Sequence, residues 1–244
     1  MSVPGEALIR LRGVSKRYGE GQRAVWALRE LGLEVVSGEF VSIMGPSGSG
    51  KSTALNLIAG LDVPTSGEVV VDGQVVSGLR GHDLARFRRR TVAVVFQFFN
   101  LLPTLTAKEN VSIPLRADGL GRRETEGRVE QALRSVGMLG RAQHYPGELS
   151  GGEMQRIAVA RALATGARII LADEPTGNLD TVRGEEILRL LRRASEGDGR
   201  TVVLVTHAHR AAAYGDRMLT LRDGRIVEEV RNPRTENKVT PLHR

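Results

Sequence analysis

The chain has 244 residues, 41% of them hydrophobic and 26% charged, which is typical of a globular protein with one large domain or two small ones. Cysteine is absent, and this excludes disulfides, thiolate metal sites and a cysteine nucleophile. The net charge of +7 is carried mainly by arginine, densest at 86–90, and indicates a solvated basic surface, with an anionic membrane leaflet or nucleic acid as alternative partners.

Two features of the sequence bear on membranes. No window approaches the roughly 18 unbroken apolar residues of a membrane-spanning helix. Residues 1–13 lack the basic region and apolar run of a secretory signal. If the protein works at a membrane, we expect another chain to supply the membrane part.

Strands separated by glycine turns are predicted in the first ninety residues. Apolar and β-branched residues indicate three of them, at Ala7–Leu11, Trp26–Val36 and Glu68–Val76, the last with a hairpin turn at 71–74. Phe40–Met44 is a short apolar run ending at glycines, as expected of a buried parallel strand. The chain then continues as a helix over Lys51–Ala59, which Gly60 closes.

Helices dominate the prediction for residues 88–165. Thr106 and Glu109 match a capping box that opens a short helix, which Pro114 should end or kink. Two further helices are predicted at Arg123–Val136 and Glu153–Thr165. This stretch reads as a helical insertion between strands.

The last third returns to alternating strands and helices. Buried strands are predicted at Arg168–Ala172 and Thr201–Thr206, on either side of a helix at Val182–Ala194. Two weaker strands follow at Met218–Leu221 and Arg225–Glu229. From about residue 231 the sequence becomes polar, which predicts a loose tail.

A glycine-rich loop joins the predicted strand 40–44 to the following helix. Its residues fit the P-loop pattern: Gly45, Pro46, Ser47, Gly48, Ser49, Gly50, Lys51, Ser52 and then Thr53. Such a loop wraps backbone N–H groups around phosphates beside a helix N-terminus. Lys51 would reach the β- and γ-phosphates, and the Ser52 hydroxyl would bind Mg²⁺.

Two adjacent carboxylates, Asp173 and Glu174, end the buried strand at 168–172. In the Walker B role, Asp173 would hold the hydration shell of Mg²⁺. Glu174 would then act as the general base that polarises the attacking water. Alone, this Asp-Glu-Pro sequence fits a helix N-cap turn equally well, and the P-loop on the same predicted sheet favours the catalytic interpretation.

The sequence Leu149-Ser150-Gly151-Gly152-Glu153 precedes a helix and resembles the signature motif of ABC ATPases. A serine hydroxyl and glycine N–H groups at a helix N-terminus form a second anion cradle. The resemblance implies that two copies pair head to tail, so that each signature motif closes on ATP held by the P-loop of the other.

Other features resemble the same family in the same order along the chain. The resemblance, which covers roughly residues 7–230, implies four roles: adenine stacking by Tyr18, a Q-loop Gln97 that senses Mg²⁺ and contacts a permease, a D-loop containing Asp180, and a switch His207 at the γ-phosphate. Two positions depart from the family pattern, because Ala208 replaces a usual aspartate and Met154 a common glutamine. Activity is still expected, since neither position touches phosphate in the family.

The sequences at 99–111 and 175–181 are similar to those of the lipoprotein-releasing and macrolide-exporter group. The resemblance implies an ATPase that uses ATP and Mg²⁺, pairs with a second copy, and energises an integral membrane permease from the cytoplasmic face of the inner membrane. No direct contact with the transported substrate and no nucleic-acid partner are expected.

The expected fold is α/β, a RecA-like P-loop NTPase core with an N-terminal antiparallel β-subdomain and a helical insertion. We expect a single ABC ATPase domain over 1–244. Its core comprises 7–87 and 166–230, its helical subdomain is 88–165, and its tail is 231–244.

Three other functions compete with an exporter ATPase. An importer ATPase shares every nucleotide motif. An ABC ATPase acting on DNA or ribosomes is disfavoured by the single cassette and by the absence of a long coiled-coil insertion. A P-loop kinase gives the signature motif no role.

Overall fold

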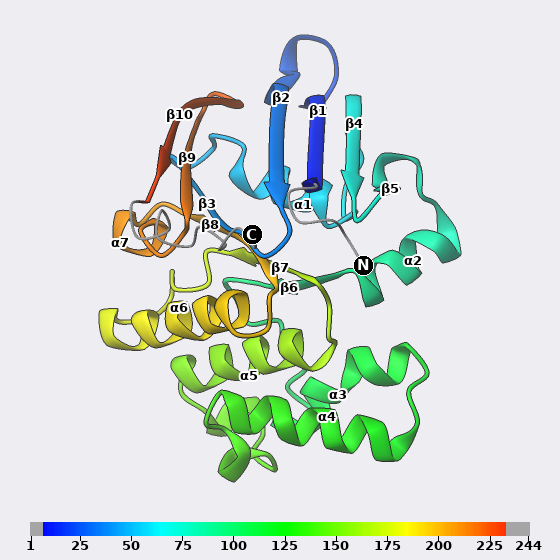
Figure 1. The fold of residues 1–244 in the computed structure, drawn as a ribbon, viewed down its shortest axis with the longest axis vertical. Coiled ribbons are helices and arrows are strands. Elements are labelled where there is room, and N and C mark those ends of the chain that lie inside the picture. The colour runs from blue at the N-terminus through cyan, green and yellow to red at the C-terminus, as the bar shows by residue number, and fades with distance from the viewer. Residues whose placement is uncertain (1–6, 233–244) are drawn as a thin grey trace, which may run out of the picture.

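In the computed structural model the described residues are 7–232, and they form two β-sheets and a group of helices arranged in layers (Figure 1). Within that range no helix is long and apolar enough to cross a membrane. The predicted loose tail at 231–244 lies outside the described residues from 233 onward.

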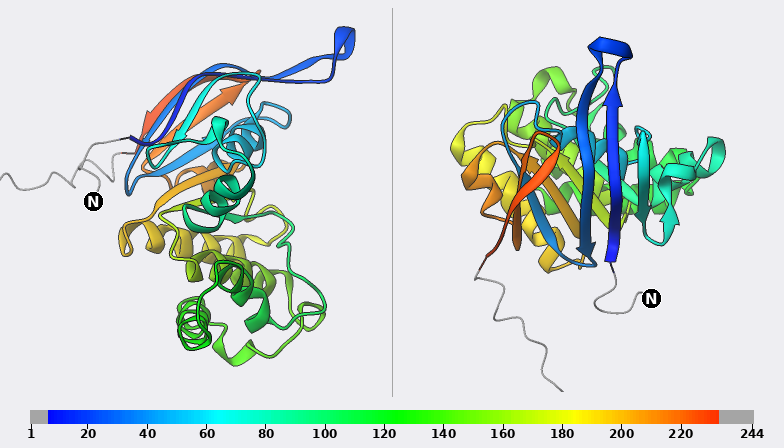
Figure 2. Two further views of the ribbon diagram at one scale, coloured as in Figure 1. Left: turned by 90° about the vertical axis from the view of Figure 1, so that its right-hand side faces the viewer. Right: turned by 90° about the horizontal axis from the view of Figure 1, so that it is seen from above.

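The smaller sheet is antiparallel, with strand order β2-β1-β4-β5. Its strands are β1 (Ala7–Tyr18), β2 (Val25–Val36), β4 (Ser66–Val71) and β5 (Gln74–Val75). The predicted hairpin turn is confirmed, since Val71 pairs with Gln74. β1 runs further than predicted because register shifts around Gly13, which has φ +55°, let the strand bend and continue. The tip of the β1–β2 hairpin projects from the molecule (Figure 2).

The larger sheet has strand order β10-β9-β3-β8-β7-β6. Its strands are β3 (Phe40–Met44), β6 (Val92–Val95), β7 (Ile169–Asp173), β8 (Thr201–Thr206), β9 (Arg217–Arg222) and β10 (Arg225–Arg231). All neighbours run parallel except β9 and β10, which form the predicted hairpin. β8 therefore lies between the strand that ends in the P-loop and the strand that ends in the two carboxylates.

Both faces of the larger sheet are covered, which explains its continuous apolar strands. Along β7, Ile169 and Leu171 face helix α1 (Lys51–Ile58) and the smaller sheet, whereas Ile170 and Ala172 face the helices. On that second face lie α3 (Ala107–Ala117), α4 (Arg122–Ser135), α5 (Gly151–Ala164) and α6 (Thr181–Glu196). The P-loop helix α1 is thus held between two sheets.

The predicted helices are present, but α3 is longer than predicted and two further helices, α2 (Gly81–Arg90) and the short α7 (His209–Ala212), were not predicted from the sequence. The Thr106–Glu109 capping box is confirmed, but α3 continues through Pro114 to Ala117. Only one N–H is lost there, and burial of Val111 and Leu115 keeps the helix packed. Strand β6 was also not predicted from the sequence.

Strand β6 lies inside the stretch that was predicted to be a helical insertion. It pairs with β7 as the edge strand of the larger sheet. Residues 92–95 therefore belong structurally with the strands, and the proposed helical subdomain is better begun after them.

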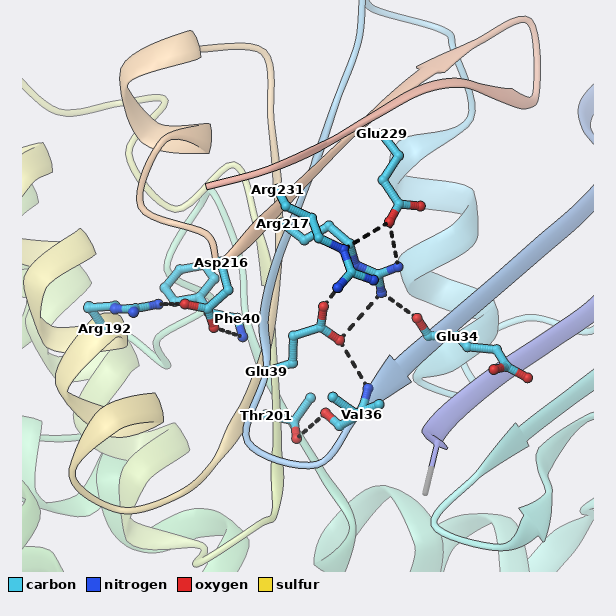
Figure 3. Close-up of polar contacts among 10 residues, drawn as sticks. All are labelled: Glu34, Val36, Glu39, Phe40, Arg192, Thr201, Asp216, Arg217, Glu229 and Arg231. Atoms are coloured by element: carbon cyan, nitrogen blue, oxygen red, sulfur yellow. Dashed lines mark hydrogen bonds and ion pairs between the residues drawn. The ribbon is translucent and has the colours of Figure 1, made fainter. Parts of the chain in front are cut away.

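A polar junction ties the start of β3 to β9, β10 and α6 (Figure 3). The Asp216 carboxylate accepts hydrogen bonds from the Phe40 backbone N–H at 2.9 Å and from Arg192 at 2.6 Å. Arg217 contacts Glu39 at 2.8 Å and Glu229 at 3.2 Å, and also donates to the Glu34 carbonyl. These contacts fix the strand that delivers the P-loop.

Asp216→Ala is expected to lower the free energy of unfolding by about 2–3 kcal/mol, because the Phe40 N–H loses its side-chain acceptor and Arg192 loses a partly buried carboxylate, keeping Glu196 and the Tyr214 carbonyl. Asp216 and Arg192 side chains are both only 19% exposed, so water replaces the lost contacts poorly. Chemical denaturation measures the change. Glu130→Ala, which breaks the exposed Glu130–Arg134 pair on α4, is the control and should cost a few tenths of a kcal/mol. Equal losses in the two variants would contradict the structural role of the junction.

Candidate active site

Three neighbouring parallel strands deliver the predicted catalytic residues to one edge of the larger sheet. β3 leads into the P-loop, β8 ends just before His207, and β7 ends at Asp173. The carboxyl ends of parallel strands are where open α/β sheets bind ligands. Residues from three separate parts of the chain therefore meet at this edge.

The P-loop backbone takes conformations that require glycine. Gly45, Gly48 and Gly50 have φ of +155°, +80° and +104°. A Cβ on Gly45 would lie 2.1 Å from the Leu221 carbonyl oxygen, and one on Gly50 would lie 2.3 Å from the Ala27 carbonyl oxygen. The buried Lys51 ammonium donates to the Gly45 and Pro46 carbonyls, both at 2.9 Å, and so holds the loop in a curve around itself.

Gly45→Ala is expected to lower the free energy of unfolding by about 3 kcal/mol and to weaken ATP binding, because the methyl group would collide with the Leu221 backbone. Thermal unfolding with and without ATP measures both effects. Gly147→Ala is the matched control, since no heavy atom lies within 4 Å of its added Cβ. A Gly45→Ala protein as stable as this control would refute the steric argument.

The P-loop and the end of β7 are joined by a direct hydrogen bond. Ser52 Oγ donates to Asp173 Oδ1 at 3.0 Å. Burial raises the pKa of Asp173; the neighbouring Glu174 charge acts in the same direction, and the Ser52 hydrogen bond and Lys51 oppose it. A hydroxyl and a partly buried carboxylate side by side form an oxygen-only pair that a bound cation would stabilise.

Glu174 and His207 form a second pair at the same edge. His207 Nδ1 lies 2.9 Å from Glu174 Oε1, and the Glu174 N–H donates to the Val205 carbonyl at 2.9 Å. Glu174 has φ +46°, which is unusual for a residue with a side chain and occurs typically at functional sites. The Glu174 side chain is 14% exposed, whereas His207 is 63% exposed and faces outward.

The predicted Q-loop and D-loop residues lie against each other. Asn178 Nδ2 donates to the Gln97 carbonyl at 3.1 Å, and a Cβ on Gly177 would lie 2.9 Å from Gln97 Nε2. Within residues 7–232, no hydrogen bond joins the Gln97 side chain to Ser52 or Asp173. Asp180 caps α6 by accepting from the Arg183 N–H at 3.0 Å.

Tyr18 ends β1 beside the helix that follows the P-loop. Its hydroxyl donates to Asp62 Oδ2 at 2.7 Å, and the side chain remains 44% exposed. Burial and the Asp62 hydrogen bond raise the pKa of Tyr18, while the Thr53 hydroxyl acts in the opposite direction. The structure thus brings Tyr18 next to Thr53 and α1.

The signature residues form a helix cap away from the P-loop. Ser150 Oγ accepts from the Glu153 N–H at 3.4 Å, and the Glu153 carboxylate accepts from the Ser150 N–H at 2.8 Å. Gly151 lies near Leu179 and Phe99, and Gly152 lies against Arg183. Across the described part of the chain, no hydrogen bond or ion pair links 150–153 to 45–53.

One residue of the site was missed in the sequence. Arg161 on α5 donates to the carbonyls of Phe99 at 2.8 Å and Asn100 at 2.6 Å, two consecutive residues with φ of +58° and +49°. Arg161 therefore attaches residues 99–100, which follow Gln97, to helix α5, and α5 begins at the signature residues. The available signal was a lone arginine within the alanine-rich run 157–164.

A protein-family comparison matches residues 28–177 to the family described as ABC transporter. The chain belongs to the ABC transporter family. The matched range includes the P-loop, Gln97, the signature residues and the Asp173–Glu174 pair, so the ABC cassette is the ATP-binding and ATP-hydrolysing part of a transporter.

Known ABC proteins resemble this chain closely. The ABC transporter ATP-binding protein MJ0796 of Methanocaldococcus jannaschii is 48% identical, over 91% of this chain and 96% of that protein. A solved dimeric structure of MJ0796 in a post-hydrolysis state with ADP and phosphate has a TM-score of 0.85 at 45% identity, covering 91% of this chain and 98% of that one. The predicted P-loop NTPase fold is confirmed.

Longer ABC relatives are also similar. The macrolide export ATP-binding/permease protein MacB of Brucella abortus is 46% identical over 93% of this chain. The chain spans only 35% of that protein. The predicted resemblance to the macrolide-exporter group of ABC ATPases is therefore confirmed at the level of the cassette.

Proposed function

We propose that two copies of this ABC ATPase bind ATP and Mg²⁺ between them and drive an integral membrane permease of the macrolide-export or lipoprotein-release type. The protein would then lie on the cytoplasmic face of the inner membrane as a peripheral subunit. The observation that carries the proposal is the pairing of Ser52 with Asp173 and of Glu174 with His207 at one sheet edge.

The donor set suits a hard divalent cation. Ser52 and Asp173 supply oxygens 3.0 Å apart that would hold Mg²⁺, with phosphate oxygens and waters as its other ligands. Gln97 would join this set only after its side chain turns from Gly177. When bound, Mg²⁺ neutralises charge on the β- and γ-phosphates.

The protein groups would divide the remaining chemistry among them. Lys51 exchanges the Gly45 and Pro46 carbonyls for phosphate oxygens. Glu174 accepts a proton from water as the water oxygen attacks the γ-phosphorus, and the bond to the β–γ bridging oxygen breaks to release ADP. His207, oriented by Glu174, would donate a hydrogen bond to a γ-phosphate oxygen.

The position of the signature cap supports a shared site. Ser150 and the N–H groups of α5 form an anion cradle that makes no contact with the P-loop of its own chain within residues 7–232. A second copy, turned head to tail, would bring each cradle to the ATP of the other. The dimeric structures of the relative MJ0796 are consistent with such pairing.

The permease is proposed from the relatives. MacB proteins are named as combined ATP-binding and permease proteins, and this chain aligns with about a third of them. The resemblance to the macrolide-exporter group further implies that the partner is a permease of few spans with a large outer domain.

Affinity capture tests the proposed partner. Tagged Glu174→Gln protein is recovered from native membranes with ATP, and co-purifying proteins are identified by mass spectrometry. A permease with few spans and a large outer domain is the expected result. A many-span permease with a solute-binding protein would indicate an importer, and recovery of ribosomes or DNA without a membrane protein would overturn transport while leaving the ATPase unaffected.

A further inference from the structure

The hydroxyl of Tyr18 is fixed by a carboxylate that the proposed function does not use. Asp62 follows α1 in the chain, and its two oxygens serve different partners. Oδ2 accepts from the Tyr18 hydroxyl at 2.7 Å, and Oδ1 accepts from Lys16 Nζ at 2.6 Å and from the Val63 N–H at 2.7 Å. Asp62 therefore connects β1 to the turn after the P-loop helix.

Lys16 completes this arrangement. It lies two residues before Tyr18 on β1, so both side chains are on one face of the strand. Its ammonium lies 4.9 Å from the centroid of the Tyr18 ring and also donates to the Val63 carbonyl at 2.7 Å. The Lys16 side chain is only 13% exposed, so this cation is held at the ring, whereas Tyr18 itself is 44% exposed.

The positive charge of Lys16 is paired with the negative charge of Asp62. Burial acts to raise the pKa of Asp62, but hydrogen bonds from Lys16, Tyr18 and the Val63 backbone outweigh it, and the pKa lies below its usual value. The carboxylate is therefore ionised at neutral pH and can hold both partners at once. A charge-assisted hydrogen bond of this kind is stronger than one between neutral groups.

We infer that Asp62 is a positioning residue for the nucleotide base: with Lys16, it fixes the exposed Tyr18 ring relative to α1 so that the ring stacks on adenine. This inference rests on the stacking role that the family resemblance assigns to Tyr18. Tyr18 ends β1, immediately before the projecting hairpin tip. Without Asp62, the Tyr18 hydroxyl would lose its hydrogen bond to the turn after α1 and keep only Thr53 of α1 as a partner. ATP itself would then have to complete the ordering of the ring, which lowers affinity.

The test compares ATP with tripolyphosphate, which contains the phosphates but no base. Asp62→Ala is expected to raise the KM for ATP about fivefold to tenfold, as expected for loss of part of one base–aromatic stack. The kcat should stay within about twofold, and the affinity for tripolyphosphate should not change. Asp62→Asn, whose amide oxygen still accepts from Tyr18, should recover most of the affinity and provides a readout if Asp62→Ala does not fold.

A double-mutant comparison separates this inference from the role of Tyr18. Tyr18→Ala should raise the KM on its own, and adding Asp62→Ala to it should have no further effect. Glu68→Ala is the matched control, because it removes an exposed carboxylate that pairs with Arg12 of β1 at 3.3 Å.

Three results would overturn the inference. An unchanged KM in Asp62→Ala, with a raised KM in Tyr18→Ala, would refute the positioning role alone. An equal rise in KM from Asp62→Ala with and without Tyr18 would show that Asp62 acts by another route. An unchanged KM in Tyr18→Ala would refute the stacking role itself, and the inference with it.

Discussion

Glu174→Gln is expected to lower kcat at least about a hundredfold while leaving ATP affinity within a fewfold of the wild-type value. Glutamine has nearly the same shape and can still accept from His207, but it cannot take a proton from water, a contribution typically of 10²- to 10⁴-fold. Because ATP then persists, the protein should accumulate as an ATP-bound dimer. Phosphate release measures turnover, and light scattering with ATP measures mass.

The matched control for this substitution is Glu124→Gln. It removes an equal charge from an exposed ion pair with Arg128 on α4, and turnover should be unchanged. Hydrolysis by Glu174→Gln near the wild-type rate would refute the assignment of the base. An ATP-bound variant that stayed monomeric at high concentration would count against the shared site.

Lys51→Ala is expected to weaken ATP binding at least about a hundredfold and to abolish turnover. Two effects combine. The variant loses a charge-assisted contact with the β- and γ-phosphates, and the Gly45 and Pro46 carbonyls lose the donor that now curves the loop. Isothermal titration calorimetry measures the affinity.

Lys108→Ala on α3 is the control for charge, since it removes one of the few lysines in the chain without touching the P-loop. Its ATP affinity should match that of the wild type. If Lys51→Ala also bound ATP with wild-type affinity, the phosphate role of the P-loop lysine would be refuted.

The elements that the sequence predicted well are those with strong local signals. Phe40–Met44 and Thr201–Thr206 are continuous apolar runs bounded by glycines or polar residues, and both strands match the prediction in full. The capping boxes at Thr106 and Ser150 fix the starts of α3 and α5 by side-chain hydrogen bonds between near neighbours. Such interactions involve residues only three positions apart, so they can be recognised in the sequence.

The missed elements depend on distant parts of the chain. Val92–Val95 is only four residues long and directly follows an arginine-rich helix, so its identity as a strand depends on pairing with β7. Helix α2 buries a single side chain, Phe87. Neither segment has enough periodicity of its own to be recognised.

The residues of the active site also differ in whether their sequence signal is local. The P-loop and the Asp173–Glu174 pair were predictable because their spacing is local. Arg161 and Asp62 were not, because Arg161 binds the Asn100 carbonyl 61 residues away and Asp62 binds the Tyr18 hydroxyl 44 residues away. The left-handed φ of Glu174 likewise follows from the fold and leaves no trace in the sequence.

Because β8 lies between β3 and β7, the larger sheet cannot form during synthesis until β8 has been made. Strand β3 has two neighbours, β8 and β9, and both are synthesised more than 150 residues after it. Until the ribosome has passed residue 206, β3 and β7 each expose an unpaired apolar edge, which is a template for aggregation. We therefore expect nascent chains truncated before β8 to have an incomplete catalytic edge and to need chaperone protection, whereas released chains that include β8 and β9 can bring Lys51, Asp173 and His207 together.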